Sequence, residues 1–200
     1  MGERIAVLVS GSGTNLQTLL DHPFCGPRIA LVVSDRPGVR ALERAGAHGV
    51  EAVVLEPAAF DDRDAFDRAL ADLLRRQGVD AVVAAGYLRL LGPAVLEAYG
   101  GRILNVHPSL LPAFPGTRSV ADALAYGVQW TGVSVIVVDE GMDTGAIVLQ
   151  EPIEVLPDDD EDSLEARVHA VEHRLLPEAT VALLEGRLSI DGRRARIAAS

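Results

Sequence analysis

The segment Asn-Val-His-Pro at residues 105–108 combines two side chains that could act on a carbonyl group. It overlaps an apolar run, residues 103–106, that is typical of a buried strand. Because side chains alternate along a strand, Asn105 and His107 should share one face. An amide and an imidazole there could stabilise and protonate the oxygen of a carbonyl under nucleophilic attack. The same pattern also fits a partly buried structural histidine.

A carboxylate that could assist this histidine occurs in Asp-Glu-Gly-Met-Asp-Thr-Gly, residues 139–145. The segment follows a long apolar run, and Gly141 and Gly145 permit a tight turn. Such a turn could direct Asp143 toward His107, where the carboxylate would favour the imidazolium and accept a proton. Asp is also frequent in turns for local reasons, so the residues alone leave the catalytic and the turn-forming interpretations open.

A glycine-rich segment, Ser-Gly-Ser-Gly-Thr-Asn at residues 10–15, lies between the first apolar run and the first helical pattern. Gly11 and Gly13 allow a tight turn, and the N–H groups at the start of a helix attract a phosphate. The dinucleotide-binding pattern is incomplete, because Leu16 stands at its last glycine position, although Asp35 is placed where a ribose-binding acid belongs. We expect a phosphate site here, while a plain tight turn and a nicotinamide-cofactor site stay open.

The elements that must position these residues are predicted by hydrophobic periodicity. The expected strands are residues 5–9, 29–34, 52–55, 81–85, 103–106 and 133–138; the expected helices are residues 15–21, 38–47, 63–77 and 164–184. Pro177 should end or kink the last helix, and the proline-rich residues 107–118 should form an extended loop. The alternation predicts an α/β, Rossmann-like fold: a mostly parallel central sheet with helices on both faces and ligands beyond the carboxyl ends of its strands.

The composition limits the classes of partner. The 29 acidic and 18 basic side chains give a formal charge of −11, which disfavours binding to nucleic acid through its phosphates. A single cysteine, Cys25, suits a reducing compartment, so we expect a cytoplasmic protein. The apolar run before residue 10 is too short for a signal peptide or a membrane span. His169 and His173 lack an evident third ligand, so we expect no metal site.

Five segments together resemble the phosphoribosylglycinamide formyltransferases, a family of folate-dependent enzymes of purine synthesis. In chain order they are VLVSGSGTNLQTLL, AGYLRLLGP, ILNVHPSLLPAFPG, VVDEGMDTGAIVLQEPI and EARVHAVEHRLLP. The resemblance implies one formyltransferase domain at residues 1–188, followed by a short tail at residues 189–200. It also implies direct transfer of a formyl group from the cosubstrate 10-formyltetrahydrofolate to the amine of glycinamide ribonucleotide, through a tetrahedral intermediate and without a metal.

The same resemblance implies roles for individual residues. Asn105 and His107 match the residues that stabilise and protonate the oxyanion, and Asp143 matches the carboxylate that tunes the histidine. The phosphorylated substrate would contact Gly13, Thr14 and Asn15. Glu172 on the last helix would hold the amine-bearing end of that substrate. The folate site would be lined by Arg63, Leu88, Arg89, Leu90, Leu91 and Asn105.

The chain departs from the family pattern at three positions. Arg118 lies where many relatives have a histidine-containing sequence, Ile136 replaces a common strand histidine, and Ala146 replaces a frequent proline. Methionyl-transfer-RNA formyltransferases share the Asn, His and Asp arrangement but carry a further C-terminal domain, for which we expect no residues here. The functions of a formyltetrahydrofolate hydrolase and of a nucleotide-binding oxidoreductase stay open. The sequence also leaves the oligomeric state, monomer or homodimer, open.

Overall fold

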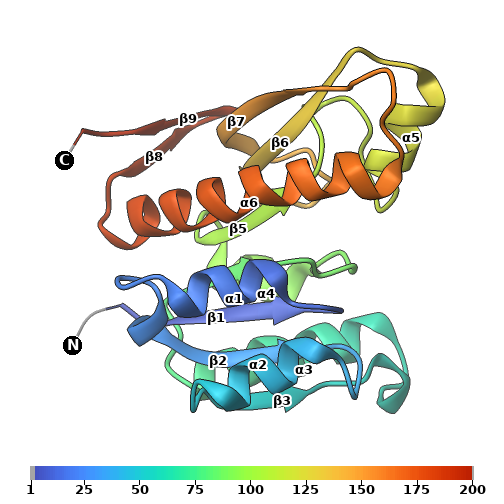
Figure 1. Cartoon of the computed structure of the whole chain (residues 1–200). Coiled ribbons are helices and arrows are strands. Elements are labelled where there is room, and N and C mark those ends of the chain that lie inside the picture. The colour runs from blue at the N-terminus through green and yellow to red at the C-terminus, as the bar shows by residue number, and fades with distance from the viewer. Residues whose placement is uncertain (1–2, 200) are drawn as a thin grey trace. The chain divides into compact units, whose positions relative to one another are not determined.

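The computed structural model describes residues 3–199 of the chain. Residues 1, 2 and 200, which the predicted domain and tail include, lie outside the described residues. The chain forms two compact units, whose boundary falls between Leu104 and Asn105 (Figure 1). The strand that carries Asn105 and His107, β5 (Ile103–His107), crosses this boundary.

The first unit is a parallel sheet built through helical crossovers. Its strands are arranged in the order β3-β2-β1-β4, and all three neighbouring pairs are parallel. The elements are β1 (Ile5–Val9), α1 (Thr14–Asp21), β2 (Ile29–Ser34), α2 (Arg40–Ala47), β3 (Ala52–Val54), α3 (Arg63–Arg76), β4 (Ala81–Ala84) and α4 (Pro93–Tyr99). Two 3-10 turns, η1 (Gly26–Arg28) and η2 (Pro57–Ala59), join them. Right-handed crossovers place α1 and α2 on one face of this sheet and α3 on the other.

The apolar runs of the sequence become strands because both faces of this sheet are covered. All five residues of β1 and all four of β4 are buried, as expected for parallel strands between two layers of helices. In α3, Phe66, Leu70 and Leu74 recur at intervals of four and are buried, while the opposite side is charged. Asp62 begins this helix by accepting a hydrogen bond from the Ala65 N–H.

The second unit carries a mixed sheet against one long helix. After β5 come α5 (Ser119–Tyr126), β6 (Trp130–Val137), β7 (Ala146–Glu154), α6 (Glu161–Leu184), β8 (Leu188–Asp191) and β9 (Arg194–Ile197). The order β6-β7-β9-β8 has antiparallel β6–β7 and β8–β9 pairs and a parallel β7–β9 pair. Figure 1 shows α6 lying along β6 and β7, which it contacts.

The long helix α6 continues through a proline. It begins with reciprocal hydrogen bonds between Asp160 and Ser163, a capping box. The prediction that Pro177 could end the helix was wrong, because α6 extends to Leu184. Most residues after Arg174 are buried, and this burial outweighs the roughly 3 kcal/mol cost of an interior proline. Among residues 3–199, neither α6 nor any shorter helix is long and apolar enough to cross a membrane.

Several elements were not predicted. The sequence reasoning missed α4, α5 and β7, and it described the last residues only as a tail. The structure places the antiparallel pair β8–β9 in that segment, with Gly192 at a positive φ of 58° in the turn. The expected strands at residues 5–9 and 29–34 coincide with β1 and β2.

A buried carboxylate joins α3 to the start of α4. Asp67 is 3% exposed, and its oxygens accept hydrogen bonds from the N–H groups of Gly92 at 2.7 Å, Ala94 at 2.7 Å and Val95 at 3.2 Å. The N-cap residue of α4 is Gly92, which has no side chain, so Asp67 supplies the capping acceptor from another helix. A Cβ at Gly92 would lie 2.6 Å from the Asp67 carboxyl carbon, so the close approach requires glycine.

Replacing this carboxylate should destabilise the protein. We expect Asp67→Ala to lower the free energy of unfolding by about 2–4 kcal/mol, because buried N–H groups lose a charged acceptor. Urea unfolding followed by circular dichroism measures the change. The control is Asp72→Ala, which removes only an exposed ion pair with Arg75 on the same helix and should cost less than about 0.5 kcal/mol. Equal, small effects of both substitutions would contradict this role of Asp67.

Candidate active site

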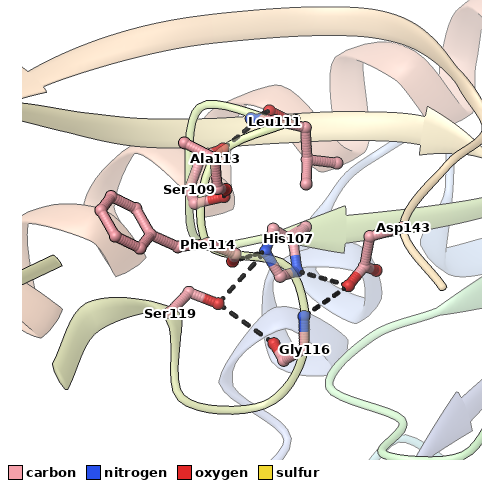
Figure 2. A network of polar contacts seen from close by, with 9 residues as sticks. His107, Ser109, Leu111, Ala113, Phe114, Gly116, Ser119 and Asp143 are labelled. Carbon is pink, nitrogen blue, oxygen red and sulfur yellow. Dashed lines mark hydrogen bonds and ion pairs between the residues drawn. The ribbon is translucent and has the colours of Figure 1, made fainter. Parts of the chain in front are cut away.

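The imidazole of His107 is buried at the end of β5, and oxygen atoms lie at both of its nitrogens (Figure 2). Nε2 lies 2.9 Å from the carbonyl oxygen of Phe114, and Nδ1 lies 3.5 Å from Oδ2 of Asp143. A carbonyl oxygen only accepts, so Nε2 carries a proton, and the Asp143 carboxylate lies on the side of Nδ1.

Two residues at this site have backbone conformations that L-residues rarely adopt. Within residues 3–199, Phe114 at φ 49° and Asp143 at φ 54° are the only non-glycine residues with positive φ. Such conformations cost energy and persist where the surrounding structure fixes them. The Phe114 ring packs edge-on against Tyr126, with ring centroids 5.9 Å apart. Each of these two left-handed residues has an oxygen that faces a nitrogen of His107.

The loop that carries Phe114 is held by buried polar side chains. Ser134 on β6 donates to the carbonyl of Ser109 at 2.7 Å and accepts from the N–H of Leu111 at 3.1 Å. Gln150 on β7 donates to the Leu111 carbonyl at 3.0 Å, and the Ser109 hydroxyl donates to the carbonyl of Ala113. The prolines of this loop have no N–H to bond, so these contacts fix its path. The predicted extended loop is therefore a defined structure anchored on β6 and β7.

The turn between β6 and β7 sets the position of Asp143. Oδ1 of Asp139 accepts from the N–H of Gly141 at 3.1 Å and from the hydroxyl of Thr144 at 2.6 Å. A Cβ at Gly145 would lie 1.8 Å from the carbonyl oxygen of Val137, so this position requires glycine. The residue types alone allow Asp143 either to form a turn or to face His107. In the structure Asp143 lies in the turn and its carboxylate also faces the imidazole.

The remaining predicted residues of the second unit lie on β5 and α6. Asn105 is half-buried, two residues before His107, so the two side chains leave the strand on one face. Glu172 is 4% exposed, with Oε2 3.9 Å from Nε2 of His169. The rings of His169 and His173 stack in parallel, 5.9 Å apart. No group of three or more His, Cys, Asp and Glu side chains in the described part of the chain is placed to hold a metal ion.

The predicted phosphate turn in the first unit is packed tightly against α2. Gly13 precedes α1 with φ 70°, and a Cβ there would lie 2.7 Å from that of Ala41. The N–H of Ala41 donates to the Gly11 carbonyl at 3.2 Å, and Arg44 donates to the carbonyl of Ser12 at 2.9 Å. These contacts fix the turn, and Thr14 and Asn15 follow in the first turn of α1, whose N–H groups lack intrahelical acceptors.

The predicted folate-lining residues of the first unit lie together. Leu88 and Leu90 are 51% and 45% exposed, whereas Leu91 is buried. Arg63 at the start of α3 donates to the Leu90 carbonyl at 3.3 Å. Arg89 lies over the ring of Phe66, 5.4 Å from its centroid. The Leu88 N–H donates to the hydroxyl of Ser10, so this segment adjoins the predicted phosphate turn.

Asp35, the possible ribose-binding acid, lies inside the first unit. It is 6% exposed. Burial raises the pKa of the Tyr87 phenol well above its usual range, and the charge of Asp35 raises it further. Asp35 therefore lies close to a phenol that stays neutral.

Three residues around His107 were missed by the sequence reasoning. The carbonyl of Phe114 and the hydroxyl of Ser119 contact Nε2, and the N–H of Gly116 donates to Asp143 at 2.8 Å. Two of these contacts come from backbone atoms, which residue type does not reveal. For Ser119, the sequence offered one indication: serine is common at the start of a helix, and here it follows Gly116 closely.

Comparisons with known proteins identify relatives of this chain. The chain is 40% identical over 185 residues to a phosphoribosylglycinamide formyltransferase of Bacillus subtilis, covering 91% of this chain and 95% of the relative. It is 45% identical over 194 residues to a protein of the same name from Mycobacterium tuberculosis, covering 96% and 90%.

Solved structures give the same result. Glycinamide ribonucleotide transformylase 1 from Symbiobacterium toebii superimposes with a TM-score of 0.95 at 50% identity, covering 98% of this chain and 94% of that one. This match confirms the predicted α/β, Rossmann-like fold with a mostly parallel central sheet. The profile of the family described as formyl transferase matches residues 3–180. The chain therefore belongs to the formyl transferase family.

Proposed function

We propose that this chain transfers the formyl group of 10-formyltetrahydrofolate to the amine of glycinamide ribonucleotide, a step of purine synthesis. Membership of the formyl transferase family makes it an enzyme that transfers formyl groups. The observation that carries the proposal is the buried imidazole of His107, with the Phe114 carbonyl at one nitrogen and the Asp143 carboxylate at the other. Oxyanion stabilisation in formyl transfer requires hydrogen-bond donors held in a fixed position, and these contacts fix the ring.

The proposed reaction passes through a tetrahedral intermediate. The amine nitrogen attacks the formyl carbon, a C–N bond forms, and the carbonyl oxygen becomes an oxyanion. The Asn105 amide and the Nδ1–H of His107 donate hydrogen bonds to that oxygen, because the Nε2 side of the ring is occupied by Phe114 and Ser119. The amine must lose a proton, and Asp143 beside His107 is the carboxylate that assists its removal. The intermediate then collapses, the bond from carbon to the folate nitrogen breaks, and that nitrogen takes up a proton.

We propose that glycinamide ribonucleotide is bound at both of its ends, its negatively charged phosphate by N–H groups and its amine by a carboxylate. Its phosphate would bind the N–H groups at the start of α1, in the turn of Gly13, Thr14 and Asn15. Its amine-bearing end would be held by the carboxylate of Glu172, which is 4% exposed. A buried carboxylate attracts an amine more strongly than an exposed one, because water screens the charge less.

The folate would contact the exposed leucines of the first unit. Leu88 and Leu90 present apolar surface suited to a flat pterin ring, and Leu91 supports them from the interior. Arg63 and Arg89 hold this segment against α3 through the Leu90 carbonyl and the Phe66 ring. Asn105 on β5 completes the proposed set of folate-lining residues.

We place the enzyme in the cytoplasm with small molecules as its partners. The single cysteine, Cys25, is buried, and burial raises the pKa of its thiol to about 11. A thiol with so high a pKa is inert at neutral pH and has no part in the reaction. The excess of acidic side chains opposes binding to nucleic acid.

The molecule that accepts the formyl group distinguishes a transferase from a hydrolase: it is an amine for the transferase and water for the hydrolase. Purified protein should deplete 10-formyltetrahydrofolate only when glycinamide ribonucleotide is supplied, measured by absorbance as the deformylated folate accumulates. Rapid loss of the formyl group with water alone would favour the hydrolase. Addition of NAD should leave the melting temperature unchanged, whereas stabilisation by NAD would favour the oxidoreductase.

Substitution of the two catalytic groups tests the mechanism. We expect His107→Ala and Asp143→Asn each to lower turnover roughly a hundredfold or more, as loss of general acid–base and oxyanion groups does elsewhere. Steady-state kinetics measure turnover, and circular dichroism checks that each variant is folded. Glu140→Gln, an exposed carboxylate in the same turn, is the matched control and should retain activity. Near-normal turnover in both folded His107 and Asp143 variants would refute the assignment.

A further inference from the structure

Ser119 closes a ring of polar contacts around the imidazole of His107 (Figure 2). On one side, Oδ2 of Asp143 lies 3.5 Å from Nδ1 and accepts from the N–H of Gly116 at 2.8 Å. On the other side, Oγ of Ser119 lies 3.1 Å from Nε2 and donates to the carbonyl of Gly116, also at 3.1 Å. A single residue, Gly116, therefore links the partners of both ring nitrogens.

The direction of these hydrogen bonds follows from the single proton of the Ser119 hydroxyl, which can be donated to only one acceptor. The Ser119 hydroxyl has one proton, and the Gly116 carbonyl, which can only accept, takes it. The lone pairs of Oγ then face Nε2 and share its proton with the Phe114 carbonyl. Ser119 is 1% exposed, so water does not compete for these bonds. Two hydrogen-bond acceptors at Nε2 hold the His107 ring in one orientation.

We propose that Ser119 is a positioning residue for the formyl transfer. Its hydroxyl fixes the rotation of the His107 ring, and through Gly116 it joins that ring to the segment that binds Asp143. Ser119 does not contact the substrates; it keeps Nδ1 on the side of Asp143. This inference rests on the proposed function of His107 as the proton donor to the oxyanion.

Substitution of Ser119 should separate turnover from substrate binding. We expect Ser119→Ala to lower kcat about tenfold, because the His107 ring loses one of the hydrogen bonds that position it, with the KM of each substrate changed by less than about twofold. Ser119→Thr retains the hydroxyl and should restore most of the activity. Should Ser119→Ala fail to fold, Ser119→Cys keeps the side chain in place with a poorer hydrogen-bonding group.

Nuclear magnetic resonance of the free protein provides a readout independent of turnover. With 15N-labelled histidine, the Nε2–H proton of His107, assigned through His107→Gln, should give a slowly exchanging signal in the native protein and in Ser119→Thr. It should broaden or vanish in Ser119→Ala. The matched control is Ser109→Ala, which removes a buried hydroxyl from the same loop without touching the ring and should keep the signal.

The two experiments separate this inference from the proposed function. Native kcat together with an unchanged Nε2–H signal in Ser119→Ala would overturn the role of Ser119. Loss of the signal in Ser109→Ala as well would also overturn it, because the loop as a whole would then be responsible. Absence of formyl transfer by the native protein would refute the proposed function, whereas the signal would still show whether Ser119 positions the ring.

Discussion

The imidazole of His107 has oxygen acceptors at both of its ring nitrogens, and the chemistry of the site depends on this arrangement. The carbonyl of Phe114 lies at Nε2 beside the hydroxyl of Ser119, and the carboxylate of Asp143 lies at Nδ1; Phe114 and Asp143 both have left-handed backbones. Each such conformation costs on the order of 1–3 kcal/mol. The cost is offset by neighbours that allow no easy relaxation: Ser134 holds the first loop and Asp139 the second. The strands β6 and β7 thus serve as the scaffold for both acceptors.

Much of this arrangement could be predicted from the sequence because it depends on residue types at strand ends. The continuous apolar runs of β1 and β2 predicted their bounds, since strands covered on both faces need no polar residues. Alternation along β5 placed Asn105 and His107 on one face. Two glycines around Asp143 predicted a tight turn, and the structure places its carboxylate near the ring.

Other features depend on contacts that local sequence does not specify. The strand β7 was missed because Gln150, Glu151 and Pro152 interrupt its apolar pattern, and only the pairing with β6 reveals it. The helix α6 passes through Pro177 because tertiary burial outweighs the local preference. The contact between the Phe114 carbonyl and His107 requires a positive φ that a phenylalanine does not predict. Which backbone carbonyls accept hydrogen bonds depends on the three-dimensional path of the loop, so the residue types alone do not predict them.

The arrangement around the histidine would be tested most directly by a crystal structure of the protein with glycinamide ribonucleotide and an unreactive analogue of 10-formyltetrahydrofolate. The decisive quantities are the distances from His107 to the Asp143 carboxylate and to the oxygen on the transferred carbon. Our account predicts that Asp143 contacts the imidazole directly or through one water, and that His107 and Asn105 both donate to that oxygen within about 3.2 Å. It would be contradicted by a complex in which these three side chains face separate regions.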